Sequence, residues 1–158
     1  MSHAVVLVAI DPTDDIEKAL AEQMAPFYEG DEMCRRGSRW DWYVIGGRWD
    51  GFLQSENILH REKVNPDEFK PALAFLRNRR WHENDRWGWL GRPTATECEY
   101  HDNGNGDGVG KCLFRDSETG AEIVCWKSDQ KTWDKKFYDR FVKPLDPKTI
   151  LIAVDYHV

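Results

Sequence analysis

The stretch A-V-V-L-V-A-I at residues 4–10 decides the fold class, because it is apolar at every position. A strand exposed on one face alternates apolar and polar residues, whereas a strand covered on both faces is apolar throughout. The end of the chain, T-I-L-I-A-V-D-Y-H-V at residues 149–158, has the same character over its first half. We therefore expect both ends of the chain to form central strands of one sheet.

Two helices are expected between these terminal strands. Asp11-Pro12 is a helix-start signal and Pro26 ends the apolar periodicity, so the first helix should cover residues 12–25. The second should begin near residue 128 and end before Pro144. Its apolar side chains recur every four residues, which predicts a face turned towards the core: Trp133, Phe137 and Phe141.

The middle of the chain predicts a further strand and a third helix. W-D-W-Y-V-I at residues 40–45 is rich in aromatic and β-branched residues, which is typical of a strand, and Gly46-Gly47 ends it. Asn65-Pro66-Asp67-Glu68 has the pattern of a helix cap. We expect a helix after it, with three apolar residues on one side: Phe69, Leu73 and Leu76.

The segment before the final helix predicts a hairpin. Its arms are residues 111–114 and 122–126, joined through a polar turn, and they bring Cys112 and Cys125 close together. The run D-N-G-N-G-D-G-V-G at residues 102–110 is rich in Gly and Asn, which predicts a flexible loop.

Taken in order, these elements predict a single α+β domain over residues 1–158. We expect a mixed or antiparallel sheet with helices packed on one face. Because both termini are predicted to be buried strands, a ferredoxin-like arrangement is one option. The length of 158 residues fits one domain with a core of its own.

Composition and net charge argue against several classes of protein. No apolar stretch approaches the length of about 20 residues that a membrane span needs. The sequence starts without the basic region or the cleavage site of a signal peptide, so we expect a cytoplasmic protein with no membrane partner. The net charge of −6 argues against a general nucleic-acid coat or a membrane-surface binder, which makes nucleic acid a disfavoured partner.

Charge is nonetheless unevenly distributed along the chain. Residues 11–32 carry eight acidic residues against Lys18 alone. An acidic helix can mimic nucleic acid and dock on a basic protein, so we expect a partner-binding surface at Asp14, Asp15 and Glu22. Residues 35–48 and 77–92 are instead rich in Arg interleaved with Trp. That composition suits a phosphate-bearing or planar ligand, and equally an ordinary surface in which Arg stems cover Trp rings.

The block W-D-W-Y-V-I-G-G-R-W-D-G at residues 40–51 holds a candidate ligand site. Backbone N–H groups next to a guanidinium suit an anion, and indole rings suit a planar group. The alternative is that the aromatic residues fill a core beneath a glycine bend. The expected ligand is nucleotide-like, and its binding residues would be Trp42, Tyr43, Gly46, Gly47, Arg48 and Trp49.

Two polar residues of the final strand are candidate catalytic groups. Asp155 and His157 are two positions apart, so on a strand both side chains point to the same face, where the carboxylate could orient the imidazole as a general base. With Arg48 as a phosphate clamp and Asp41 as a second orienting group, this set would process a phosphoester or a nucleotide. The alternative is that Asp155 and His157 form the polar face of a strand leaving the core. Fingerprints of standard hydrolases, NTPases and dehydrogenases do not occur in the sequence.

One set of residues could bind zinc. Cys98, His101, Cys112 and Cys125 supply four ligand types that zinc accepts. Their spacing is not that of a recognised zinc finger, and cysteine is among the residues most often simply buried. Buried thiols are the favoured interpretation, and we expect no cofactor.

The motif W-D-W-Y-x-I-G-G-R-W at residues 40–49 resembles a block found in a family of small proteins encoded by bacteriophages and other mobile elements. The strand V-V-L-V at residues 5–8, W-G-W-L-G at residues 87–91 and the terminus V-D-Y-H-V at residues 154–158 are similar to further elements of that family. The resemblance implies an origin in a mobile element. Because small phage proteins are often directed at the host, it also implies a counter-defence role, such as inhibition of a CRISPR system.

The expected function is therefore that of a non-enzymatic binding protein directed at a host system. Its partner would be a host protein or a nucleotide-like small ligand. The alternative is a small phosphoester- or nucleotide-processing enzyme that uses Asp155 and His157 with Arg48.

Overall fold

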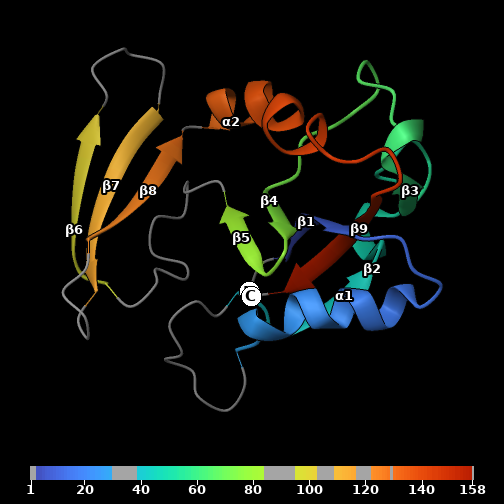
Figure 1. The fold of residues 1–158 in the computed structure, drawn as a ribbon, viewed down its shortest axis with the longest axis horizontal. Coiled ribbons are helices and arrows are strands. Elements are labelled where there is room, and N and C mark those ends of the chain that lie inside the picture. The colour runs from blue at the N-terminus through green and yellow to red at the C-terminus, as the bar shows by residue number, and fades with distance from the viewer. Residues whose placement is uncertain are drawn as a thin grey trace.

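A computed structural model describes residues 3–29, 39–83, 95–102, 109–116, 122–128 and 130–157, and the side chains of residues 3–29, 39–82 and 131–157. The main body is a six-stranded sheet with the order β2-β9-β1-β4-β5, in which β3 also pairs with β9. Figure 1 shows this sheet between two helical layers. Its strands are β1 (His3–Ile10), β2 (Trp42–Ile45), β3 (Ile58–His60), β4 (Ala74–Arg77), β5 (Arg80–Glu83) and β9 (Ile150–His157).

The two terminal strands lie side by side at the centre of this sheet. β1 and β9 pair antiparallel over their full length, from His3 opposite His157 to Ile10 opposite Ile150. β4 is the parallel neighbour on the other side of β1, while β2 and β3 pair antiparallel with β9. The prediction of two central terminal strands is confirmed.

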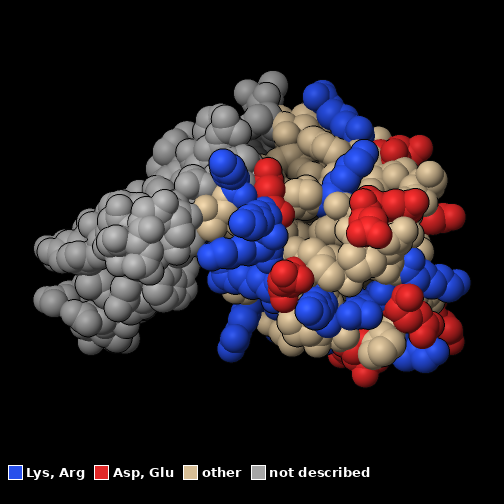
Figure 2. Space-filling view, turned by 90° about the horizontal axis from the view of Figure 1, so that it is seen from above, with Lys and Arg blue, Asp and Glu red and all other residues tan. Residues whose placement is uncertain are grey.

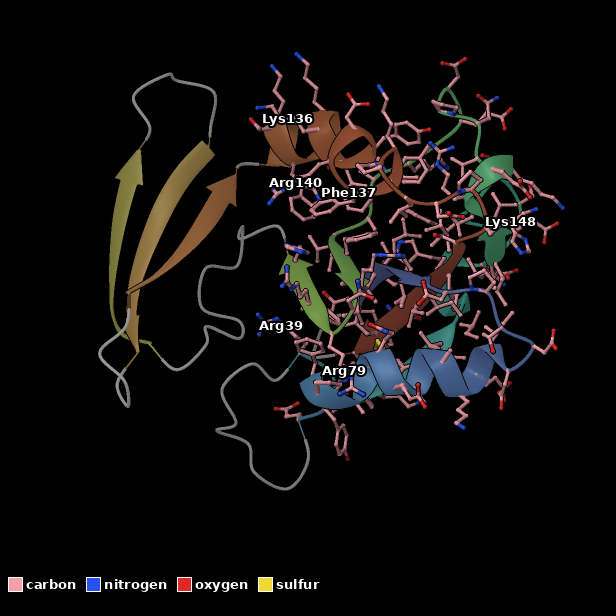
Figure 3. The ribbon with its side chains drawn as sticks, viewed as in Figure 1. Arg39, Arg79, Lys136, Phe137, Arg140 and Lys148 are labelled. Carbon is pink, nitrogen blue, oxygen red and sulfur yellow. The ribbon has the colours of Figure 1, made fainter. Side chains whose placement is uncertain are left out.

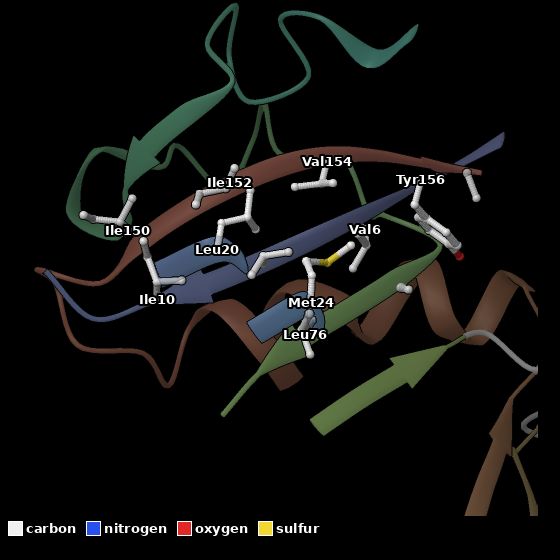
Figure 4. Close-up of a cluster of buried hydrophobic side chains, with 12 residues drawn as sticks. Val6, Ile10, Leu20, Met24, Leu76, Ile150, Ile152, Val154 and Tyr156 are labelled. Carbon is white, nitrogen blue, oxygen red and sulfur yellow. The ribbon is translucent and has the colours of Figure 1, made fainter. Parts of the chain in front are cut away.

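The helices cover opposite faces of the sheet (Figure 1). α1 (Ile16–Met24) buries Leu20 and Met24 against one face, and Figure 4 shows both side chains among alternate residues of β1 and β9. α2 (Gln130–Phe137) and the π-helical turn that follows it (Tyr138–Val142) cover the other face, mainly with three aromatic side chains: Trp133, Phe137 and Phe141.

This arrangement confirms the α+β class with a mixed sheet, and it differs from the expectation that the helices share one face. β1 is apolar at every position from Ala4 to Ile10, so it presents apolar surface on both sides. Val6 and Val8 join the core under α1, whereas Val5 and Leu7 join the core under α2. Both surfaces must be covered because apolar area exposed to water is unfavourable. A helix on each face also separates this fold from the ferredoxin-like arrangement.

The residues after Asn65 form a single turn in place of the predicted third helix. Oδ1 of Asn65 accepts the backbone N–H of Asp67 at 3.1 Å, and its carbonyl accepts that of Glu68 at 3.1 Å, so the cap does close one turn. From Ala74 the chain is β4, and its parallel pairing with β1 buries Phe75 and Leu76. That burial outweighs a cap contribution of about 1 kcal/mol.

β4 and β5 are joined by a two-residue turn, Asn78-Arg79, in which both residues have positive φ. Such a turn matches the twist of a hairpin; Asn adopts this conformation readily, whereas Arg does so rarely. The side-chain oxygen of Gln23, on α1, accepts the backbone N–H of Arg79 at 2.8 Å. α1 is thereby attached to the end of the hairpin.

A second, three-stranded antiparallel sheet contains β6 (Ala95–Asp102), β7 (Val109–Asp116) and β8 (Glu122–Ser128). β7 and β8 form the predicted hairpin, and Cys112 and Cys125 are direct Cα partners in it. The hairpin pairs with β6 rather than with the central sheet. In the predicted loop 102–110 the two ends belong to strands, and residues 103–108 lie outside the described residues. None of the helices in the described ranges has the length and apolarity that crossing a membrane requires.

Candidate functional site

The aromatic residues around β2 are divided between core and surface, because successive side chains of a strand point to opposite faces. Tyr43 packs into the core under α1, edge-on to Trp40, whose indole N–H donates to the Met24 carbonyl at 2.8 Å. Burial, and then the Glu17 carboxylate, raise the pKa of the Tyr43 phenol. Trp42 lies on the opposite face of β2 and is 50% exposed. Tyr43 therefore belongs to the core, whereas Trp42 lies at the surface of the same strand.

Gly46-Gly47-Arg48 forms a tight turn in which two backbone N–H groups donate to acceptors within the protein. The Gly46 N–H donates to the Ala153 carbonyl at 2.9 Å, and the Arg48 N–H donates to Oδ2 of Asp155 at 3.0 Å. Gly47 has φ +53°, and a Cβ at this position would lie 2.5 Å from Oδ2 of Asp155. Glycine is therefore required at position 47. Two of the N–H groups that the sequence interpretation assigned to an external anion are used inside the protein.

Asp155 is a buried carboxylate whose side chain is 1% exposed. Its Oδ1 lies 2.8 Å from Nδ1 of His3, so the partner of Asp155 is His3 and not His157, which the sequence interpretation had paired with it. His157 is instead bound by Asp41, with 2.6 Å between Nδ1 and Oδ1. Two Asp–His dyads result, and we call them together the two-dyad site: His3, Asp41, Asp155 and His157.

The register of the sheet places the two imidazoles next to each other. His3 on β1 is opposite His157 on β9, and His157 is opposite Trp42 on β2. The ring centroids of His3 and His157 are 5.0 Å apart, and those of His3 and Trp42 are 5.8 Å apart. The side chains of His3 and His157 are 19% and 16% exposed. Both imidazoles are therefore partly accessible from solvent.

This geometry is suited to proton transfer. A carboxylate at Nδ1 orients an imidazole and leaves Nε2 to take up or release a proton. Within the described residues, the imidazoles of His3 and His157 have no hydrogen-bond partner other than their carboxylates. Two such groups about 5 Å apart can reach two oxygen atoms of one substrate at hydrogen-bond distance. No group of three or more His, Cys, Asp or Glu side chains in this part of the chain is arranged to hold a metal ion.

Arg48 and Trp49 lie on the 3₁₀ turn that follows β2 (Gly47–Trp49). The Arg48 side chain is exposed, and its backbone shares the Asp155 carboxylate with His3. Trp49 is half-buried against the core under α2. Among the predicted ligand-binding residues, Trp42 and Arg48 therefore border the two-dyad site. Tyr43 and Trp49 pack inside, and the two glycines shape the turn.

His3 is the member of the site that the sequence interpretation missed. It stands just before the apolar run of β1, where nothing in its local sequence marks it as functional. A signal was nevertheless present in the two terminal strands. If both are central and antiparallel neighbours, the first residues of one lie beside the last residues of the other, and His3 then meets His157.

The acidic residues predicted to bind a partner lie at the start of α1 and on it. Asp15 is the N-cap of the helix, and its Oδ1 accepts the Lys18 N–H at 3.1 Å. Asp14 and Glu22 are exposed. Asp15 therefore has a structural task in addition to its charge.

The four zinc candidates are distributed over the second sheet. Cys98 and His101 lie on β6, Cys112 on β7 and Cys125 on β8. Their side chains lie outside the described residues. The zinc site and the buried thiols both stay predictions.

Two of the four sequence blocks behind the phage-family resemblance meet at the two-dyad site. Residues 40–49 contribute Asp41 and Trp42, and residues 154–158 contribute Asp155 and His157. Family membership stays a prediction, and the function is inferred from the geometry alone. No family model, curated protein or solved structure matches the chain.

Proposed function

We propose that this protein is an acid–base enzyme that cleaves a phosphodiester of a ribonucleotide at the two-dyad site. The observation that carries the proposal is the pair of imidazoles 5.0 Å apart, each held at Nδ1 by its own carboxylate. Metal-free cleavage of a ribonucleotide needs one proton acceptor and one proton donor on either side of the phosphorus. An imidazole can act as either group, so two imidazoles can supply both.

The proposed step uses the 2′-hydroxyl of the substrate as the nucleophile. Nε2 of one neutral imidazole takes the proton of this hydroxyl while the 2′-oxygen bonds to phosphorus. The bond between phosphorus and the 5′-oxygen breaks, and Nε2 of the second, protonated imidazole gives its proton to that oxygen. The products are a 2′,3′-cyclic phosphate and a 5′-hydroxyl, and proton exchange with water restores the two imidazoles.

Two neighbouring side chains support binding of such a substrate. Trp42 stands in one row with both imidazoles and is half exposed, so a base can stack on its ring. The Arg48 side chain is exposed. Its backbone N–H donates to the Asp155 carboxylate that orients His3, so the side chain leaves the backbone next to this dyad. A guanidinium binds a phosphate through two parallel hydrogen bonds.

The proposal is tested with a ribodinucleotide, uridylyl-adenosine, and its 2′-deoxy analogue. The wild-type protein should cleave the first and not the second, because only the first carries the nucleophile. H157Q and H3Q should each lower the rate by about 10²-fold or more, since each removes one proton-transfer group. H60Q is the matched control, because His60 lies on β3 outside the site.

Circular dichroism of each variant separates loss of activity from loss of fold. Glutamine retains a hydrogen-bonding group near the carboxylate, which favours folding of both site variants. A wild-type rate no higher than that of the H3Q/H157Q double variant, prepared identically, would overturn the proposal. Full activity in a folded H157Q protein would do the same.

A second proposal keeps the binding function expected from the sequence, and the exposed acidic surface of α1 favours it. Asp14, Glu17 and Glu22 are all exposed, with Lys18 as the one cation on that helix. A basic host protein would be attracted to this surface. D14K/E22K should abolish capture of that protein from bacterial lysate, whereas K136E on the opposite layer should not. Asp15 is left unchanged because it caps the helix.

A further inference from the structure

The segment that contains α2 and the π-helical turn is strongly basic, although the whole chain has a net charge of −6. Between residues 130 and 143 there are two acidic residues, Asp134 and Asp139, against five cations. All five cationic side chains are exposed, and we call them the basic surface: Lys131, Lys135, Lys136, Arg140 and Lys143. Figure 2, which views the molecule from the α2 side, shows Lys and Arg gathered over this part of the fold.

Lys136 and Lys143 of the basic surface are available to a ligand, whereas the guanidinium of Arg140 lies over the Phe141 ring, 4.9 Å from its centroid. In the part of the chain that the structure describes, no ion pair involves Lys136, Arg140 or Lys143. Figure 3 shows Lys136 on the outer side of α2, whereas Phe137 points towards the sheet.

The basic surface extends from α2 towards β5. Burial, and then the charges of Arg140 and Arg80, lower the pKa of His82 on β5. Arg80 and His82 are two positions apart on β5, so both side chains point to the same face of the sheet. Arg140 lies over the Phe141 ring, 4.9 Å from its centroid. The His82 ring also packs 5.2 Å from the Phe141 ring, which joins β5 to the helical layer.

The basic surface and the two-dyad site lie on the same side of the sheet. Val5, Leu7, Leu151 and Ala153 face α2. Because side chains alternate along a strand, His3 points to the same side as Val5, and Asp155 and His157 point to the same side as Ala153. One extended ligand can therefore lie along the basic surface and reach the dyads without crossing the sheet.

We propose that the basic surface binds the phosphate backbone of single-stranded RNA, so that the substrate of the two-dyad site is an RNA strand and not a free nucleotide. This inference rests on the proposed function for the choice of RNA over other polyanions. Spaced lysines and arginines bind successive phosphates without reading sequence, and the released counterions make the affinity depend strongly on salt. The acidic surface of α1 lies on the opposite layer, and the acidic residues of α2 and the π-helical turn are Asp134 and Asp139.

The test is binding of a fluorescent 12-nucleotide RNA with 2′-O-methyl groups, which cannot be cleaved, followed by fluorescence anisotropy at two salt concentrations. K136E should weaken binding by about five- to tenfold and reduce the salt slope by about one. K18E is the matched control, because it makes the same charge change at an exposed lysine of α1, on the other layer. It should leave the dissociation constant within about twofold.

The outcomes separate this inference from the proposed function. Equal effects of K136E and K18E, or no binding of the RNA, would overturn the inference while cleavage of the dinucleotide could still stand. RNA binding that depends on Lys136, in a wild-type protein that cleaves nothing, would support the surface and overturn the enzyme.

Discussion

The carboxylate of Asp155 accepts the backbone N–H of Arg48 at 3.0 Å, across 107 residues of sequence. The same carboxylate binds His3 at 2.8 Å. One buried acid thus joins three segments of the chain: the first strand, the glycine turn after β2 and the last strand. The turn and the dyad share this group, so the geometry of the site depends on the packing of the turn.

Gly47→Ala should destabilise the protein by about 3 kcal/mol. Alanine at φ +53° is strained, and its Cβ would lie 2.5 Å from Oδ2 of Asp155 and 2.8 Å from Cγ1 of Val44. Gly51→Ala is the control, because Gly51 also has positive φ but its Cβ would meet nothing closer than 3.5 Å. The control should lose only about 1 kcal/mol. Urea denaturation measures both, and equal losses would show that the contact with Asp155 is unimportant.

Asp155→Ala should lower the free energy of unfolding by about 3 kcal/mol, because it leaves the Arg48 N–H and Nδ1 of His3 without their acceptor. Asp41→Ala removes the carboxylate of the other dyad, but that side chain is 45% exposed, so water can replace it. Its cost should stay below about 1 kcal/mol. Thermal and chemical denaturation of the two variants test this difference. A stable Asp155→Ala protein would mean that the buried dyad contributes little to the fold.

His82 should make the protein less stable in mild acid. Burial, followed by Arg140 and Arg80, lowers the pKa of His82 below its ordinary value of 6.5. Below pH 6.5 the unfolded chain therefore binds a proton that the folded chain rejects, so the free energy of unfolding decreases as the pH falls through this range. His82→Phe keeps the ring contact with Phe141 and removes the titrating group. The stability of wild type relative to His82→Phe should fall between pH 7 and pH 5, and a constant difference would contradict the assignment.

Asp15→Ala should lower the free energy of unfolding by about 1 kcal/mol, because it removes the N-cap of α1. Asp14→Ala removes the same charge from the neighbouring exposed position, and its effect should stay within about 0.5 kcal/mol. Denaturation curves of the two variants distinguish capping from net charge. Equal losses would assign the effect to charge on the acidic surface as a whole.

The third predicted helix shows where local sequence patterns are outweighed. Asn65 does make the hydrogen bonds of a cap, but the residues that follow it supply β4. Phe69, Leu73 and Leu76 have helical spacing, yet the N–H of Leu73 donates to the Val5 carbonyl of β1 at 3.1 Å. Hydrogen bonding between β4 and β1 stabilises the fold more than a third helix would, because a helix here would leave the backbone groups on one edge of β1 unpaired.

The elements with the longest apolar patterns were predictable from the sequence by itself: β1, β9, α1 and the aromatic face of α2. In these elements the burial of apolar side chains follows directly from their periodicity. The uninterrupted apolar run of β1 requires covering layers on both faces of the sheet, although the sequence interpretation placed the helices on one face.

Only the tertiary structure decided which imidazole meets which carboxylate. His3 and Asp155 are 152 residues apart, and Asp41 and His157 are 116 residues apart. Their contacts depend on the register between β1, β2 and β9, and a shift of one residue would turn each side chain to the opposite face. Register is set by the packing of the whole sheet against α1 and α2. No short stretch of sequence contains that information.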